Sequence, residues 1–315
     1  MQQVNSLFVT GACGFIGSHL LAELVCQGFE AAILKLPQED PWRIKHLLPR
    51  IKVYEADLKD TLKIIEAVSD FRPQAIIHLA AQYKINHRSE EVPLLFQANS
   101  LGTASILEAA KETGVKHFIN TSTFFVYDSS KQSFKEEGRL KPFNLYALTK
   151  ICSEKICSFY SQEYGINCLT FRLFPPYGPA DNKRRLIPYL ISSFIKGEQP
   201  KLTQGLQEWD FIYVRDIVEA YIKAVTNFNS SPGHEIFNIG TARPVRIKEI
   251  VEKIQDILGT NIEPLYGAVA DRKNELMYVC ADNKKARKIL SWEPKIDILK
   301  DGLELTVNWY RENEQ

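Results

Sequence analysis

The sequence predicts an α/β fold in which a doubly wound parallel sheet is covered by helices on both faces, with a smaller, loop-rich C-terminal lobe. Short apolar runs alternate with longer segments of helical pattern from the start of the chain. These runs are apolar throughout, as strands buried on both faces are. With 315 residues and 45% hydrophobic positions, the chain can form one large domain and a smaller companion.

The expected elements of the large domain follow one another through the first half of the chain. A strand at 6–10, a helix at 15–28 and a strand at 30–34 make a βαβ opening. The alternation continues with strand-like and helix-like segments at 51–58, 61–71, 74–80, 95–114, 116–123, 144–164 and 166–174. We therefore expect the large domain to extend over residues 1–174.

The pattern becomes irregular after residue 174. Clusters of Pro and Gly occur at 175–179, 197–205 and 232–244. A helix-like segment and a strand-like segment within about 210–240 could return to the first sheet, so this part is assigned to the large domain. The smaller lobe is then expected from residues 175–209 and 241–315.

Composition excludes several classes of function. The 39 basic and 38 acidic residues leave a formal net charge of +1, which is too small for a general nucleic-acid binder. No apolar stretch reaches the roughly 18 residues of a membrane-spanning helix, and no signal-peptide pattern is present. The six cysteines form no C-x-x-C pair and no zinc-type cluster. We expect a cytoplasmic protein with reduced thiols, no metal site and no membrane contact.

A glycine-rich segment, TGACGFIG at 10–17, lies between the first expected strand and helix. Gly11 would allow a tight turn, Gly14 a close approach of the backbone to a pyrophosphate, and Gly17 close packing of helix on strand. Phe15 and Ile16 begin the helix, whose free N–H groups and positive dipole end attract phosphate. In this position the pattern favours a Rossmann-type dinucleotide site over a purely structural turn.

The identity of the dinucleotide depends on the end of the second strand. An acid usually stands there and binds the 2′-hydroxyl of the adenosine ribose, but this chain has Lys35. An ammonium attracts a 2′-phosphate, so Lys35 favours NADP(H). The alternative is that Lys35 is a solvated edge lysine, in which case NAD(H) is possible. Asp57, which precedes Leu58 at the end of the third strand, is placed to accept a hydrogen bond from the adenine amino group.

Tyr146 and Lys150 are four residues apart in a predicted helix and so share one face. A phenol ordinarily titrates near 10, and a nearby ammonium lowers that pKa. Such a tyrosine can exchange a proton with a carbinol or carbonyl oxygen while a hydride passes to or from nicotinamide. Together with the glycine loop, this pair predicts an oxidoreductase.

At this point the sequence resembles the extended short-chain dehydrogenase/reductases, the branch called NAD-dependent epimerase/dehydratases. The resemblance extends over almost the whole chain, in the segments TGACGFIGSHL, ADL, HLAAQ, NSLGTASILEAA, STFFVY, YALTK, RLFPPYGP, GLQEWDFIYVRDIVEAY, FNIG and ILSWEPK. It implies a catalytic triad of Thr123, Tyr146 and Lys150. It also implies a dimer formed through the Tyr/Lys helix and its neighbour. Further cofactor contacts are implied for Leu58, Ala80, Ala81, Gln82, Asn99 and Phe174.

Two phenylalanines, Phe124 and Phe125, follow Thr123 directly. In the 4,6-dehydratases of the resembled family these positions carry Asp and Glu, which move protons at carbons 5 and 6 of the sugar. Because a phenyl group cannot transfer protons, we exclude that dehydration. Reduction of a keto-sugar, epimerisation through a keto intermediate, and oxidation remain.

The C-terminal half is most similar to bacterial nucleotide-sugar 4-ketoreductases such as the CDP-paratose and CDP-abequose synthases. Two family positions that contact the substrate diphosphate differ, because Pro175 replaces an Asn and Trp209 an Arg. Arg272 matches a second family arginine, and the basic triplet at 183–185 adds charge. The expected substrate-binding residues are Phe124, Arg184, Trp209 and Arg272.

These observations lead to one preferred function and three alternatives. The preferred one is an NADPH-dependent reductase of a 4-keto-deoxy sugar attached to a nucleoside diphosphate. The alternatives are a nucleotide-sugar 4-epimerase with bound NAD, a ketoreductase of a carbonyl compound without a nucleotide, and a dinucleotide-binding module without catalysis.

Overall fold

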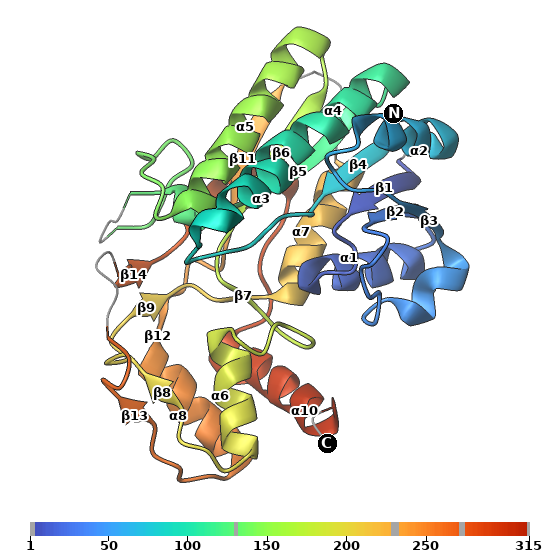
Figure 1. Cartoon of the computed structure of the whole chain (residues 1–315). Coiled ribbons are helices and arrows are strands. Elements are labelled where there is room, and N and C mark those ends of the chain that lie inside the picture. The colour runs from blue at the N-terminus through green and yellow to red at the C-terminus, as the bar shows by residue number, and fades with distance from the viewer. Residues whose placement is uncertain (1–3, 129–131, 228–232, 271–274, 314–315) are drawn as a thin grey trace.

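The computed structural model describes residues 4–128, 132–227, 233–270 and 275–313 (Figure 1). One of the expected substrate-binding residues, Arg272, lies outside the described residues. Within the described ranges no helix is both long and apolar enough to cross a membrane.

A parallel sheet of seven strands forms the centre of the larger part of the molecule, in the order β11-β6-β5-β4-β1-β2-β3 (Figure 1). The strands are β1 (Ser6–Thr10), β2 (Glu30–Lys35), β3 (Lys52–Glu55), β4 (Ala75–His78), β5 (His117–Thr123), β6 (Asn167–Leu173) and β11 (His234–Ile239). Every pairing in this sheet is parallel. The chain runs outward from β1 in one direction and from β4 in the other, so the predicted doubly wound sheet is confirmed. The carboxyl ends of β1 and β4 therefore mark the crevice where such folds bind ligands.

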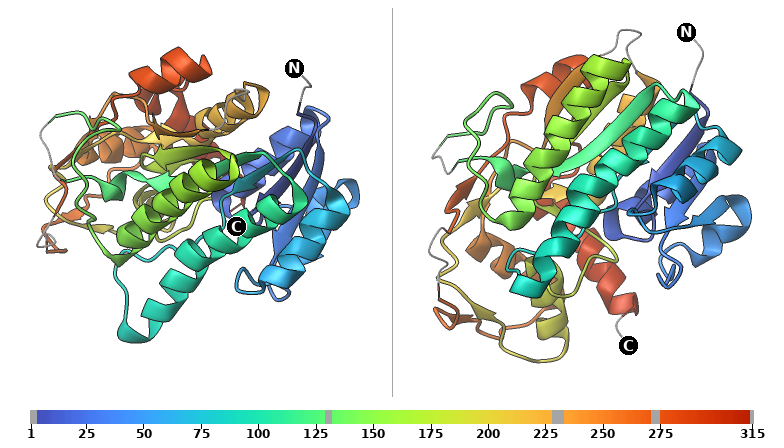
Figure 2. Two further views of the ribbon diagram at one scale, coloured as in Figure 1. Left: turned by 90° about the horizontal axis from the view of Figure 1, so that it is seen from above. Right: turned by 45° about the horizontal axis from the view of Figure 1, so that its top comes forward.

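Helices cover both faces of this sheet (Figure 2). One face carries α1 (Phe15–Cys26), α7 (Val214–Thr226) and α9 (Lys284–Leu290), and the other carries α2 (Thr61–Phe71), α4 (Gly102–Thr113) and α5 (Leu145–Tyr164). Successive side chains of β1 show how the core divides, since Leu7 and Val9 pack on the side of α1 and Phe8 packs on the side of α2. The continuous apolar runs of the sequence are thus buried on both faces.

Short helical turns lie in the connections. They are η1 (Lys45–Arg50), η2 (Ser89–Glu91), α3 (Val92–Phe96), the π-helical turn η3 (Gln97–Leu101), η4 (Phe124–Val126) and the π-helical turn η5 (Ile298–Gly302). Two of them matter for the site. The turn η3 leads into α4, and η4 follows the end of β5 directly.

A second core lies below the sheet in Figure 1, between α6 (Leu186–Ile195), α8 (Ile247–Leu258) and α10 (Leu303–Asn313). Short strands border it: β8 (Lys201–Leu202), β9 (Glu208–Trp209), β12 (Val245–Arg246), β13 (Leu265–Tyr266) and β14 (Tyr278–Val279). The pair β7 (Pro176–Tyr177) and β10 (Ile212–Tyr213) connects the two parts. We keep the division at residues 1–174 with 210–240, and 175–209 with 241–315, as a proposal, and note that α9 packs against the sheet.

Candidate active site

The glycine loop passes directly over the carboxyl end of β4. Gly11 has a φ of +73°, and a Cβ on this residue would lie 2.5 Å from the backbone nitrogen of Ala80. A Cβ on Gly17 would overlap the carbonyl oxygen of Gly11. Glycine is therefore required at both positions by the close approach of loop, strand and helix. The same closeness brings the start of α1 to the crevice between β1 and β4.

The start of α1 is open to an anion. Its N-cap is Gly14, no side chain caps it, and its first turn contains no acidic residue. The backbone N–H groups of Phe15, Ile16 and Gly17 therefore have no partner within the helix and lie at the positive end of the helix dipole. This is the arrangement that binds a dinucleotide diphosphate.

Asn99 fixes the backbone that follows β4. Its Oδ1 accepts a hydrogen bond of 2.7 Å from the backbone N–H of Gln82, and its Nδ2 donates to the carbonyl of Gln82 at 3.1 Å and to Thr149 Oγ1 at 2.9 Å. Thr149 precedes Lys150 on α5. Asn99 thus joins the segment Ala80, Ala81 and Gln82 to the helix that carries Tyr146.

His78, at the end of β4, is neutral and structural. Its ring nitrogens face Thr10 Oγ1 at 2.7 Å and Thr103 Oγ1 at 3.2 Å, and the residue is fully buried. Burial lowers the pKa of His78 to about 3, with a smaller effect from Lys150 in the same direction. The ring therefore joins β1, β4 and α4 and stays a neutral imidazole near neutral pH.

Tyr146 and Lys150 lie in the first two turns of α5, and both are buried. Lys150 Nζ has no hydrogen-bond partner among the described residues. Loss of water lowers the pKa of Lys150 to about 8, against a weaker opposite effect of Cys157 and Glu154. An ammonium that is buried without a partner, next to the dinucleotide crevice, fits the hydroxyl groups of a nicotinamide ribose.

The expected lowering of the Tyr146 pKa is wrong for this structure. Burial raises the pKa of Tyr146 well above its usual value, Tyr83 adds to the rise, and Arg185 opposes it. The phenol therefore keeps its proton throughout the neutral range. In the direction of reduction it can act as a proton donor.

Thr123 is the last residue of β5, and its Oγ1 accepts a hydrogen bond of 3.3 Å from the backbone N–H of Phe125. The backbone N–H of Phe143 donates to the carbonyl of Phe125 at 2.9 Å, so the chain just before α5 lies against η4. The structure thereby brings the hydroxyl of Thr123 to the same end of the sheet as Tyr146.

The two phenylalanines after Thr123 are buried among aromatic rings. Phe124 stacks on Phe174 with ring centroids 5.7 Å apart and meets Trp209 edge-on at 5.8 Å, while Phe125 stacks on Phe143 at 5.3 Å. These rings come from η4, the end of β6 and β9. They make an apolar wall next to Thr123. At positions 124 and 125 this wall presents phenyl rings, which cannot donate or accept protons.

Arg172 and Glu154 form a buried ion pair next to this site, which was not predicted from the sequence. Arg172 of β6 donates to Glu154 of α5 through Nη2 at 2.7 Å and Nε at 3.0 Å, and Ser122 Oγ donates to Glu154 at 2.6 Å. Ser122 precedes Thr123, and Glu154 lies one helical turn after Lys150. Breaking a buried pair by removing one partner typically costs about 3–5 kcal/mol, so this pair holds β5, β6 and α5 together. In the sequence, the one sign of this pair was that Glu154 follows Lys150 by four residues and so lies on the same face of the helix.

Lys35 is already paired. Its Nζ lies 2.7 Å from Glu55 Oε1 and donates to the carbonyls of Leu36 and Pro37 at 3.1 and 3.3 Å. Glu55 stands opposite Lys35 in the pairing of β2 with β3. The charge of Lys35 is therefore compensated within the protein, which weakens the argument for a 2′-phosphate.

The other expected adenosine contacts lie after β3. The carboxylate of Asp57 accepts from the backbone N–H of Lys59 at 3.0 Å and lies 3.4 Å from its Nζ. Leu58 packs so closely on Gly102 that a Cβ there would lie 2.9 Å from Leu58 Cδ1. Leu58 thus sets the distance between α4 and the end of β3.

The expected substrate residues have different surroundings. Trp209 packs against Phe124, and its Nε1 donates to the carbonyl of Leu276 at 2.6 Å. Arg184 is exposed. Arg185 lies 5.9 Å from the ring centroid of Tyr83, whose ring in turn meets that of Tyr146 edge-on at 5.1 Å. Of these two arginines, Arg185 is therefore the one directed toward the candidate site.

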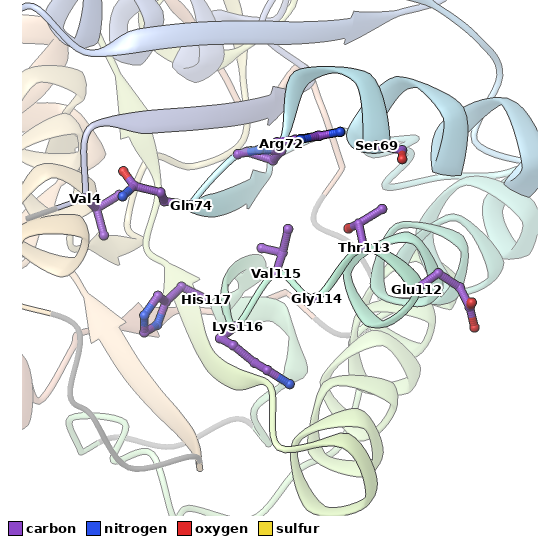
Figure 3. A pocket seen from close by; sticks show the side chains of 11 residues that line it. Val4, Ser69, Arg72, Gln74, Glu112, Thr113, Gly114, Val115, Lys116 and His117 are labelled. Atoms are coloured by element: carbon purple, nitrogen blue, oxygen red, sulfur yellow. The ribbon is translucent and has the colours of Figure 1, made fainter. Parts of the chain in front are cut away.

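A cavity of about 550 Å³ lies at the opposite edge of the sheet (Figure 3). Val4, Gln74 and His117 line it from the amino ends of the strands, together with the ends of α2 and α4. None of the candidate residues named above borders it. The described residues also contain no cluster of side chains suited to a metal ion.

Comparison with known proteins agrees with this geometry. Residues 7–240 match the NAD dependent epimerase/dehydratase family. The chain is 30% identical to the CDP-abequose synthase of Salmonella typhimurium over 301 residues, 95% of this chain and 96% of that protein. It is also 30% identical to the UDP-glucuronate 4-epimerase of Thermodesulfobacterium geofontis over 318 residues, 97% of this chain and 96% of that protein.

Two solved structures have nearly the same fold. The UDP-glucose 4-epimerase of Thermotoga maritima, solved with UDP-glucose, superposes with a TM-score of 0.90 at 28% identity, covering 98% of this chain and 100% of that one. The dTDP-glucose 4,6-dehydratase of Streptomyces venezuelae, solved with NAD bound, gives a TM-score of 0.89 at 26% identity, covering 98% of both chains.

Proposed function

Since the chain belongs to the NAD dependent epimerase/dehydratase family of extended short-chain dehydrogenase/reductases, we propose that it reduces a 4-keto-deoxy sugar carried on a nucleoside diphosphate, with NADPH as the reductant. The observation that carries this proposal is the pair Phe124 and Phe125 directly after Thr123. It leaves the triad positions in place and removes the acids that dehydration of the sugar would need.

The residues at the site fit a nicotinamide dinucleotide. The diphosphate would lie at the uncapped start of α1, over the closely packed glycines of the loop. The nicotinamide ribose would accept hydrogen bonds from the buried Lys150, which has no other partner in the described part of the chain. When bound, the cofactor donates or accepts the hydride.

We assign the proton chemistry to the triad. Thr123 would hold the carbonyl oxygen at carbon 4, and Tyr146 would give that oxygen its phenolic proton while carbon 4 gains a hydride, which leaves a carbinol. The phenolate would then recover a proton from solvent. The raised pKa of Tyr146 supports this direction, because the reduction begins with a protonated phenol whereas oxidation of a carbinol begins with a phenolate.

A nucleotide-linked substrate is supported by the relatives, which act on or bind UDP-, CDP- and dTDP-sugars according to their names. We propose that Arg185 supplies charge to the substrate diphosphate that Pro175 and Trp209 do not supply. The apolar wall around Phe124 would face the deoxy part of the sugar.

A second candidate is a nucleotide-sugar 4-epimerase that retains NAD. The pairing of Lys35 with Glu55 favours it, because a 2′-phosphate would have to displace the carboxylate from the ammonium. The solved dehydratase relative with NAD bound is consistent with this cofactor.

Isotope transfer separates the candidates. The enzyme is mixed with CDP- and dTDP-linked 4-keto-6-deoxy sugars and with NADPH or NADH that carries deuterium at the transferable position. We expect one equivalent of NADP⁺ per carbinol and deuterium at carbon 4. Interconversion of two sugars without net cofactor oxidation would make it an epimerase, and equal turnover of keto compounds without a nucleotide would remove the diphosphate from the proposal. Tight cofactor binding without any turnover would leave only a binding module.

We further propose a homodimer formed by the outer faces of α3, η3 and α5. Leu94, Leu101 and Phe159 are 50%, 58% and 52% exposed on these neighbouring elements, beside α4 in Figure 1. Phe159→Asp is expected to convert a dimer into a monomer in sedimentation velocity. Leu206→Asp is the matched control, because Leu206 is 56% exposed in the smaller lobe. A monomeric wild-type protein would contradict the proposal.

A further inference from the structure

We infer that Arg43 binds the diphosphate of the dinucleotide. The inference rests on the proposed use of a dinucleotide cofactor, but it depends neither on the choice between NAD(H) and NADP(H) nor on the sugar. Arg43 lies in the loop between β2 and η1, outside the segments that carry the family resemblance.

The side chain of Arg43 reaches the glycine loop. Its Nη1 donates to the carbonyl of Cys13 at 3.4 Å, and its Nε donates to the carbonyl of Ala180 at 3.0 Å. Cys13 directly precedes Gly14, the N-cap of α1. A guanidinium thus lies beside an uncapped helix start, and both carry positive charge toward the same place.

The charge of Arg43 is not compensated within the described part of the chain. It is half-buried, and it has no carboxylate at ion-pair distance there. The carboxylate of Asp181, which attracts it electrostatically, lies 3.5 Å from Arg185 Nε instead. Loss of water lowers the pKa of Arg43, as expected for a cation that meets only neutral acceptors. An arginine has five N–H donors, so three remain for an anion.

The position of the guanidinium is fixed. It lies 4.2 Å from the ring centroid of Trp42, and two separate backbone carbonyls orient it. Next to Ala180, the carbonyl of Pro179 contacts His19 of α1 and that of Asp181 accepts from Tyr310 of α10. Arg43 therefore belongs to a set of contacts that holds the loop after β7 against the cofactor crevice.

The surrounding charges favour the diphosphate over an adenosine 2′-phosphate. The thiol of Cys13 has a pKa raised to about 11, first by burial and next by Glu39, while Lys35 and Arg43 oppose the rise and Asp40 adds to it. A 2′-phosphate near the end of β2 would meet the carboxylate of Glu39, whose Oε2 accepts a hydrogen bond of 3.3 Å from the backbone N–H of Leu36. The diphosphate at the start of α1 would meet Arg43 and the free N–H groups.

Binding to the cofactor-free protein tests this inference. Arg43→Gln is expected to weaken NAD⁺, NADP⁺ and ADP-ribose by the same factor, about 10- to 100-fold, which is the value of a charge-assisted contact. Adenosine, which has no phosphate, should bind as it does to the wild type. Arg50→Gln is the matched control, since Arg50 is exposed and, within the described residues, donates to the carbonyl of Val25 at the far end of α1. Calorimetry gives the affinities, and their salt dependence should become shallower in the Arg43 variant.

Three results would overturn the inference. They are unchanged affinity for ADP-ribose in Arg43→Gln, a loss confined to NADP⁺, and an equal loss for adenosine. These outcomes are independent of the proposed reaction, because no sugar is present. A wild type that reduces keto-sugars while Arg43→Gln binds normally refutes only the role of Arg43, whereas a diphosphate-specific loss without any turnover refutes only the proposed reaction.

Discussion

Tyr146→Phe is expected to lower kcat by about 10²–10⁴-fold, the usual contribution of a positioned general acid. The hydroxyl is the only group that the substitution removes, and the ring keeps its edge-on contact with Tyr83. The buried ring should also keep its packing, so the fold and the affinity for the dinucleotide should be retained. Single-turnover reduction of the keto-sugar, followed by the loss of reduced-cofactor absorbance, measures the chemical step directly.

Tyr160→Phe is the matched control for this variant. Tyr160 lies on the same helix, and its hydroxyl donates to Glu108 at 2.7 Å, on the side of α4. The control should therefore reduce the substrate at the wild-type rate. If the two variants were equally active, Tyr146 would not be the proton donor, and the direction of its raised pKa would have no bearing on the reaction.

The parts of the site that depend on local spacing could be predicted from the sequence. Gly11 and Gly17 are six residues apart along a single strand-to-helix turn, and Tyr146 and Lys150 share a helical face. The parallel, doubly wound type of sheet followed from the same local signals, because a crossover helix between two buried strands places those strands parallel. Both kinds of signal act over a few residues, so no knowledge of tertiary contacts was needed.

What the sequence could not give was the set of charges that tertiary structure brings together. The partner of Lys35 is Glu55, which stands opposite it only through the register of β2 and β3. The choice between Arg184 and Arg185 depended on how the loop turns into α6. The raised pKa of Tyr146 results first from burial, which the spacing of two residues along one helix does not reveal.

Lys150→Met should abolish most of the activity and yet stabilise the cofactor-free protein near neutral pH. Burial lowers the pKa of Lys150 from 10.5 to about 8, and its Nζ has no hydrogen-bond partner among the described residues. A pKa depression of this size corresponds to a destabilisation on the order of 3 kcal/mol while the ammonium is present in the fold. Methionine has a similar length and no charge, so it fills the space without this cost.

The stability difference between the wild type and Lys150→Met should depend on pH. Below pH 8 the folded and the unfolded chain both carry the ammonium, and the cost of burying it is complete. Between pH 8 and 10.5 folded Lys150 is neutral while the unfolded one remains protonated, so the wild type gains stability as the pH rises. The advantage of Lys150→Met in Tm should therefore be largest near neutral pH and decrease toward about pH 10. Thermal denaturation of both cofactor-free proteins across this range measures it.

Lys155→Met provides the control, because Lys155 is exposed on the same helix and its substitution should give no such pH-dependent difference. With a dinucleotide in excess the order should reverse, since the ribose hydroxyls then accept hydrogen bonds from Lys150 and stabilise only the wild type by mass action. A Met variant that is less stable at every pH, with and without cofactor, would mean that Lys150 has a permanent partner inside the protein. Its proposed role as the ribose-binding member of the triad would then be wrong, because a side chain already satisfied gains nothing from the cofactor.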